Sequence, residues 1–291
     1  MTTTPRSTRQ TRALPRVIDV APAPGRVPDE PGAGRRATLA IMSELSPKAR
    51  RALEHAHAVP LSYVVRLVRA PDGRLVAILG EAHLKLAEAS RIGKAVVSAF
   101  DLRGVETFQR KQITWGHALG FVVSAPRRLL RMLSLGAIKD STIVDAKELP
   151  SGDTVELERA NRMPLGLHVA SVYMTSFFVV SFLVLLVPIV AVVAPPLAAA
   201  ITLGGMLFQV HLLALIPGFA FRRRAWSWVI HPFLGILTLR DLLMSAGTVR
   251  MLQDHPSGPE AVVVMGRAHV SGYEALLVER YGFARVPFPT R

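Results

Sequence analysis

Residues 77–85 read AILGEAHLK, and residues 262–270 read VVVMGRAHV. Each stretch is a short apolar run that ends at a glycine and reaches a histidine three residues later. The run 260–266, EAVVVMG, is typical of a buried strand, and residues 270–283 after it have a helical pattern. Strand, short loop and helix form a βα unit, and α/β sheets place their sites at the carboxyl ends of such strands. The two stretches therefore predict an α/β fold with both Gly-x-x-His elements where a site is expected.

The central part of the chain is strongly apolar. Between Val169 and Phe221 there is no Asp, Glu, Lys or Arg. A bilayer core requires about 20 apolar residues for each helical span. We therefore predict an inserted transmembrane helical hairpin, with spans at about 169–194 and 197–221 and a turn at Pro195-Pro196.

The residues after the hairpin indicate its orientation. Arg222, Arg223 and Arg224 close the second span, and basic residues stay on the cytoplasmic side of membranes. We expect an integral protein of the inner or plasma membrane, with the lipid bilayer as a partner and both soluble flanks in the cytoplasm. The apolar segment from Trp226 onward contains Pro232, Arg240 and Asp241. It predicts an interfacial or bundle-packed helix more readily than a third span.

Local patterns divide the rest of the chain. Residues 1–40, rich in Pro, Arg, Thr and Gly, predict a disordered basic tail. The α/β domain is expected in two parts, 41–165 and 251–291, on either side of a membrane region at 166–250. The remaining expected elements follow the chain order. They are a helix capped by Ser46, a hairpin around 71–73, a helix ending at a Gly93 turn, a strand at 95–100, helical periodicity over 104–135, a strand at 141–146, a helix at 152–163 and an edge strand at 284–286.

The overall composition excludes several classes of function. The formal net charge is +14, but the basic residues are scattered and no nucleic-acid motif is present, so nucleic acid is not expected as a partner. The chain has no cysteine, which excludes disulfides and thiolate chemistry. No phosphate loop, serine nucleophile elbow or dinucleotide fingerprint occurs.

The paired motifs, Gly80-Glu81-Ala82-His83 and Gly266-Arg267-Ala268-His269, resemble those of the TraB/PrgY/GumN superfamily. Its members include the Tiki membrane proteases, pheromone-shutdown proteins and haem-binding lipoproteins. The segment 269–283 is also similar to the closing segment of that superfamily, in which a helix leads to a last strand. The resemblance implies a mixed-sheet TraB/GumN-like domain.

Two features depart from that family pattern. Tiki-like members have a glutamate in the strand after the first motif, and an alignment through Asp101 places Ala99 at that position. The acid could instead come from Glu81 or Glu106. The hairpin also lies between the two motifs, whereas we would expect it after them.

The residue types favour metal chemistry. Neutral imidazoles and carboxylates bind divalent metals and leave a coordination position for water. We expect His83, His269 and Glu81 to bind the metal (Mn, Co or Zn), with Glu81 alternatively acting as general base. Gly80 and Gly266 would allow close backbone approach, and Arg267 could steady an anionic ligand.

Several functions remain open from the sequence. The first is a metal-dependent hydrolase or peptidase. A non-catalytic protein that binds a peptide signal, a small molecule or haem, with Glu81 and His83 as iron ligands, is the main alternative. A membrane scaffold with vestigial motifs is another, and a homo-oligomer is left open. His211, inside the second predicted span, is a weaker functional candidate.

Overall fold

The computed structural model describes residues 43–82, 85–135, 137–139, 141–159, 161–184, 186–213 and 231–288. His83, the predicted tail 1–40 and the Arg222–Arg224 group lie outside these ranges. The strands are β1 (Tyr63–Arg69), β2 (Leu75–Glu81), β3 (Lys85–Leu86), β4 (Leu102–Val105), β5 (Ile138–Lys139), β6 (Asp153–Glu156), β7 (Glu260–Gly266) and β8 (Ala284–Val286). The helices are α2 (Pro47–His57), α3 (Ala87–Val97), η1 (Arg110–Gln112), α4 (Gly116–Leu133), α5 (Thr142–Glu148), α6 (Leu165–Val184), α7 (Val187–Val193), α8 (Pro195–Leu212), α10 (Pro232–Asp254) and α11 (Val270–Tyr281).

A mixed six-stranded sheet forms the centre of the molecule, in the order β6-β4-β7-β2-β1-β8. Strands β6, β4, β7 and β2 are parallel to one another, and β1 and β8 are antiparallel to their neighbours. Every residue of β2 is buried, as expected for a parallel strand covered on both faces. The predicted α/β class is confirmed, and the last strands of the chain join the same sheet as the first.

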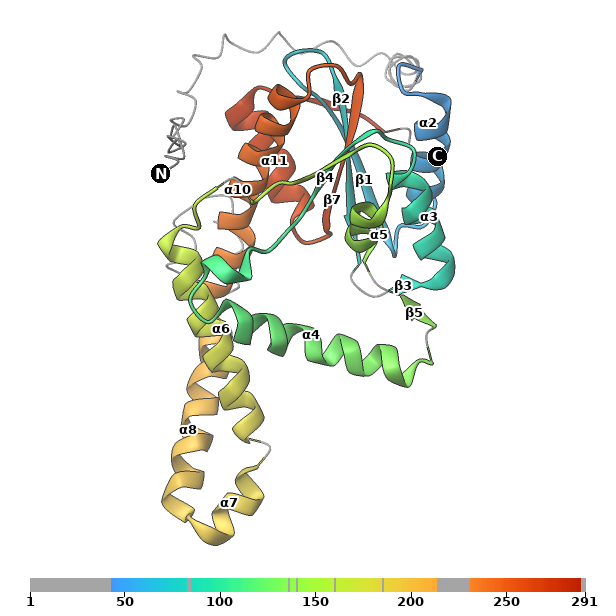
Figure 1. The fold of residues 1–291 in the computed structure, drawn as a ribbon. Helices are drawn as coiled ribbons and strands as arrows, with labels where there is room; N and C mark the ends of the chain where they lie inside the picture. The colour runs from blue at the N-terminus through green and yellow to red at the C-terminus, as the bar shows by residue number, and fades with distance from the viewer. Residues whose placement is uncertain are drawn as a thin grey trace, which may run out of the picture.

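Helices cover both faces of this sheet (Figure 1). On one face, α2, α3 and α5 pack over side chains such as Val65, Leu79 and Val264. On the other face, α10 and α11 pack over side chains such as Ile78 and Val263. The alternation within β2 and β7 is the two-residue period of a strand, so the same strands supply both halves of the core.

Several local predictions are confirmed. Helix α2 begins at Pro47, and the Ser46 hydroxyl accepts a hydrogen bond of 3.2 Å from the Ala49 N–H. Strands β1 and β2 pair from Tyr63↔Glu81 to Arg69↔Leu75 around the predicted turn. Strand β7, helix α11 and the edge strand β8 occur as expected.

Three other local predictions are wrong. Helix α3 continues through Gly93 to Val97, and the strand follows later, as β4. Residues 142–148 form α5, capped by the Ser141 hydroxyl, where we expected a strand. Residues 153–156 form β6, where we expected a helix. In each case a short amphipathic segment had no decisive period, and long-range packing selected its structure.

The apolar segment forms a helical arm that extends away from the sheet (Figure 1). Helix α6 is followed by α7 and then by α8, which begins at Pro195 with Ala194 as its N-cap. The expected single helix over 169–194 is therefore divided between α6 and α7, and Pro188 stands in the first turn of α7, where proline is tolerated.

The length and exposure of these helices bear on the membrane. Within the described ranges, α6 is long and apolar enough to cross a bilayer, and the part of α8 from Pro195 to Leu207 is a shorter apolar helical stretch. Only 28% of the apolar 18-residue stretch within α6 is buried inside the protein. Phe182, Ile189 and Leu207 are each more than half exposed. The arm is thus compatible with membrane association.

Candidate functional site

Three parallel strands end side by side at one edge of the sheet. Gly80 lies opposite Met265, and Glu81 lies opposite Gly266. The Arg267 N–H donates to the Glu81 carbonyl at 2.9 Å. On the other side of β7, the Glu106 N–H donates to the Val264 carbonyl at 2.9 Å, directly after β4. Both Gly-x-x-His segments and Glu106 therefore start from the same edge.

Gly80 is explained by this arrangement. A Cβ atom at this position would collide with the Val270 side chain and stand 3.4 Å from the Arg267 Cα. Its φ angle is not positive, so close approach, and not a left-handed backbone, is the reason for glycine here. The start of α11 can thus pack directly onto the end of β2.

His269 is buried at this edge, with 4% of its surface exposed. Its Nδ1 atom is 2.6 Å from Oδ1 of Asp241, on α10, and its Nε2 atom is 3.6 Å from Oε1 of Glu106. Burial opposes a charge on the ring, but Glu106 and Asp241 outweigh it and raise the pKa of His269 above its ordinary value of 6.5. The two ring nitrogens thus face two different carboxylates.

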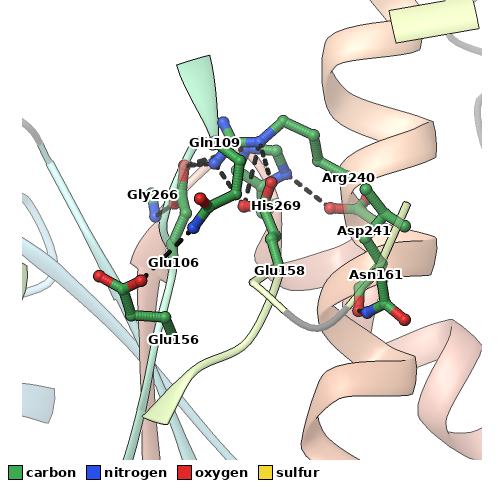
Figure 2. Close-up of polar contacts among 10 residues, drawn as sticks. Glu106, Gln109, Glu156, Glu158, Asn161, Arg240, Asp241, Gly266 and His269 are labelled. Carbon is green, nitrogen blue, oxygen red and sulfur yellow. Dashed lines mark hydrogen bonds and ion pairs between the residues drawn. The ribbon is translucent and has the colours of Figure 1, made fainter. Parts of the chain in front are cut away.

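Arg240 joins the same cluster from α10 (Figure 2). Its Nη2 atom lies 2.6 Å from Oε1 of Glu158 and 2.8 Å from Oε1 of Glu106. The Gly266 N–H donates to the other oxygen of Glu106 at 2.6 Å. Burial opposes the charge of Arg240, but the carboxylates of Glu158 and Glu106 raise the pKa of its guanidinium above the ordinary value. The guanidinium also stands 4.9 Å from the centre of the Phe108 ring.

Glu106, Glu158, Arg240, Asp241 and His269 thus form what we call the edge cluster. Arg240 and Asp241 are adjacent on α10, and the other three residues come from separate parts of the chain. Three carboxylates face one guanidinium and one imidazole. Ionised groups this far from water are retained only with close partners, and the distances above supply them.

Glu81, expected as a metal ligand, has other partners. It is fully buried, and its carboxylate accepts hydrogen bonds from the Ser141 hydroxyl and, at 2.8 Å, from the Thr142 N–H. These groups begin α5, on the sheet face opposite α10. The structure therefore brings Glu81 to a helix N-terminus, where a carboxylate is favourable. A metal role for Glu81 stays a prediction.

The other predicted site residues have mixed placements. Gly266 contributes its N–H to Glu106. Arg267 is exposed, and its Nη1 atom donates to the Pro60 carbonyl at 3.2 Å. His83 lies outside the described residues, so the expected approach of its imidazole to His269 stays a prediction. The anion-binding role of Arg267 also stays a prediction.

Reasoning from the sequence missed Glu158 and the place of Arg240 and Asp241 in the edge cluster. An adjacent Arg and Asp within an otherwise apolar helix were the available signal, because such residues require buried partners. From the sequence, Glu106 is an alternative to Glu81 as the source of the acid. Its position follows from the end of β4 at Val105, which makes Glu106 the first residue after that strand.

A second polar group lies where the arm meets the domain. The Tyr173 hydroxyl is 2.8 Å from Nδ1 of His211 and 3.5 Å from Nε2 of His231. The Phe233 N–H donates to Nδ1 of His231, which caps α10. His211, a candidate from the sequence, thus has a structural role. Through Tyr173 on α6 it links α8 to α6 and to His231, which caps α10.

No group of three or more His, Cys, Asp or Glu side chains in the described ranges is arranged to hold a metal ion. No protein-family model matches the chain, and no curated protein or solved structure matches it either. The geometry of the edge cluster is therefore the basis for assigning a function.

Proposed function

We propose that the chain is a membrane-anchored, metal-dependent hydrolase of the TraB/GumN type that acts on a peptide or a similar carbonyl substrate. The observation that carries this proposal is the orientation of His269. Asp241 holds Nδ1, so Nε2 is directed to Glu106 at the edge where the first Gly-x-x-His segment begins. A carboxylate behind a histidine is the usual support of a metal-binding imidazole.

The edge cluster offers ligands that fit a divalent ion. Ligand atoms at about 2.0–2.2 Å from one zinc ion stand about 3–4 Å apart, and Nε2 of His269 is 3.6 Å from Oε1 of Glu106. We assign these two atoms as ligands and His83 as the third. Mn, Co or Zn bound there would polarise the substrate carbonyl and activate water.

The chain's own residues prepare this site. Asp241 fixes the tautomer and orientation of the His269 ring. The Gly266 N–H and Arg240 hold the two oxygens of Glu106 in place. In this proposal Glu106 supplies the acid that Glu81 was expected to supply, and Glu81 anchors α5.

We also propose that the arm is the membrane anchor. The predicted spans, 169–194 and 197–221, contain α7, most of α6 and α8, and residues beyond the described ranges. Exposed apolar side chains along the arm support this assignment, because soluble monomers rarely expose large contiguous apolar surfaces. The cytoplasmic placement of the α/β domain is supported by Arg222–Arg224 in the sequence.

The proposal is tested on the full chain in detergent, by metal analysis and by hydrolysis of a peptide library with added Mn, Co or Zn. His269→Ala and Glu106→Gln should each lose bound metal and activity. His55→Ala, at an exposed position on α2, is the control and should lose neither. Unchanged metal content in both site variants contradicts the proposal.

Glu81→Gln separates the two assignments of the acid. If Glu81 anchors α5, this variant should keep its metal and lose thermal stability. Loss of metal at unchanged stability would return the ligand role to Glu81.

One observation favours a second candidate, a binding or regulatory membrane protein without turnover. Arg240 lies 2.8 Å from the same Glu106 oxygen that His269 faces, so a cation already stands beside that ligand position. In the haem version of this candidate, Glu81 and His83 would be the iron ligands. A Soret band on haem titration that disappears in His83→Ala would support it over the hydrolase.

A further inference from the structure

Helix α4 has two chemically different faces. Successive residues of an α-helix are about 100° apart, which places Phe121, Leu129 and Leu133 on one side and Ser124 and Arg131 on the other. The apolar side is open to solvent. Phe121 is 67% exposed, Leu129 is 52% exposed and Leu133 is 68% exposed.

The charged residues in the sequence around α4 are all basic. The sequence from Thr107 to Lys139 contains no Asp or Glu. It contains six basic residues, Arg110, Lys111, Arg127, Arg128, Arg131 and Lys139. A helix with an apolar face, a basic polar face and no acidic residue is typical of helices that lie in the surface of an anionic membrane.

The position of α4 fits that role. Among the described side chains of the helix, the buried ones are Gly116 and Leu119 in its first part, and this part lies beside α6 (Figure 1). From there α4 runs across the direction of the arm, below the sheet in the view of Figure 1. A helix in the membrane plane and a helical arm along the membrane normal would have this mutual arrangement.

Trp115, the residue before α4, supports the same reading. It is 54% exposed, and tryptophan favours the headgroup level of membranes because its ring is apolar and its N–H is polar.

We propose that α4 lies in the boundary between headgroups and acyl chains of an anionic bilayer, with Leu129 and Leu133 toward the lipid and Arg128 and Arg131 at the phosphates. This inference depends on the proposed membrane attachment of the arm. It adds a second, electrostatic contact that sets the orientation of the α/β domain. Helix α10, which the sequence predicted as an interfacial or bundle-packed helix, packs against α6 and α11, and we assign the interfacial position to α4 instead.

The absence of cysteine from the chain makes the test direct. Single variants Leu133→Cys, Ser124→Cys and Val192→Cys are labelled with an environment-sensitive fluorophore and reconstituted in vesicles, either zwitterionic or containing phosphatidylserine. Leu133 probes the apolar face of α4, Ser124 is the matched control on the opposite face, and Val192, 84% exposed on α7, reports on the arm.

With phosphatidylserine, the emission of probes at Leu133 and Val192 should shift to shorter wavelength, and the emission of the probe at Ser124 should remain that of an aqueous environment. In zwitterionic vesicles the shift at Leu133 should decrease, while that at Val192 persists. Arg128→Glu combined with Arg131→Glu should reduce the shift at Leu133 in anionic vesicles.

The outcomes separate the proposals. An aqueous signal at Leu133 with a shifted signal at Val192 overturns the role of α4 and leaves the arm as anchor. Aqueous signals at both positions remove the membrane attachment as well. Efficient cross-linking of Leu133→Cys between two copies, with the same shift in both vesicle types, overturns the proposal in favour of a dimer contact. The metal analysis above is independent of all three results.

Discussion

At the scale of single residues, Arg240 is the side chain on which the edge cluster most depends. It is the cation between Glu106 and Glu158, and both carboxylates are almost fully buried. Removing one member of a buried ion pair leaves an uncompensated charge, whereas exposed pairs contribute little. Replacing Arg240 should therefore lower the stability of the protein by more than the loss of its packing contacts alone.

We predict that Arg240→Met lowers the free energy of unfolding by about 3–5 kcal/mol, measured by urea denaturation of the full chain in mild detergent. Arg66→Met is the matched control, because Arg66 is half exposed and 3.9 Å from Glu274. That control should change stability by less than about 1 kcal/mol. Equal effects of the two substitutions would contradict the buried network.

Residue-level reasoning from the sequence reached part of the site. His269 and Gly266 were predicted as site residues, and both belong to the edge where the cluster forms. The partners of His269 could not be predicted, because Asp241 and Glu106 come from distant segments whose packing brings them together. The same is true of Glu81, whose carboxylate binds the start of a helix that the sequence had indicated as a strand.

At the scale of elements, Gly93 shows how tertiary contact overrides a local signal. The glycine indicated a turn, but it lies inside α3. A Cβ atom at this position would collide with the side chains of Tyr63 and Thr142. Glycine is therefore required for the close approach of α3 to β1 and α5.

We predict that Gly93→Ala destabilises the protein by about 1–3 kcal/mol through overpacking, although alanine favours helix by about 1 kcal/mol. Gly204→Ala is the matched control within α8. The nearest atom to a Cβ there is 3.9 Å away, at Val180, so this substitution should be neutral or stabilising. Thermal denaturation of both variants measures the difference, and a stabilising Gly93→Ala would disprove the tight contact.

At the scale of the whole molecule, the two ends of the chain share one sheet. Strand β8 pairs with β1 in the register Arg69↔Ala284. Directly opposite residues of antiparallel strands have Cα atoms about 4.5–5.5 Å apart, which is within the range of a disulfide.

We predict that Arg69→Cys combined with Ala284→Cys forms a disulfide under mild oxidation. After proteolytic cleavage within the arm, the two fragments should remain together on a non-reducing gel and separate on reduction. Each single variant serves as a control and should separate under both conditions. Failure of the double variant to cross-link would contradict the sheet order.

The sequence by itself determined the α/β class, the hairpin of β1 and β2, the βα unit of β7 and α11, and the apolar arm. Each of these depends on neighbouring residues, through apolar periodicity, turn chemistry or composition. Only the tertiary structure decided the strand order, the structures of 142–148 and 153–156, and the partners of Glu81, Glu106 and His269. These depend on contacts between residues far apart in the chain, and a buried charge obtains its partner from the packing of whole elements.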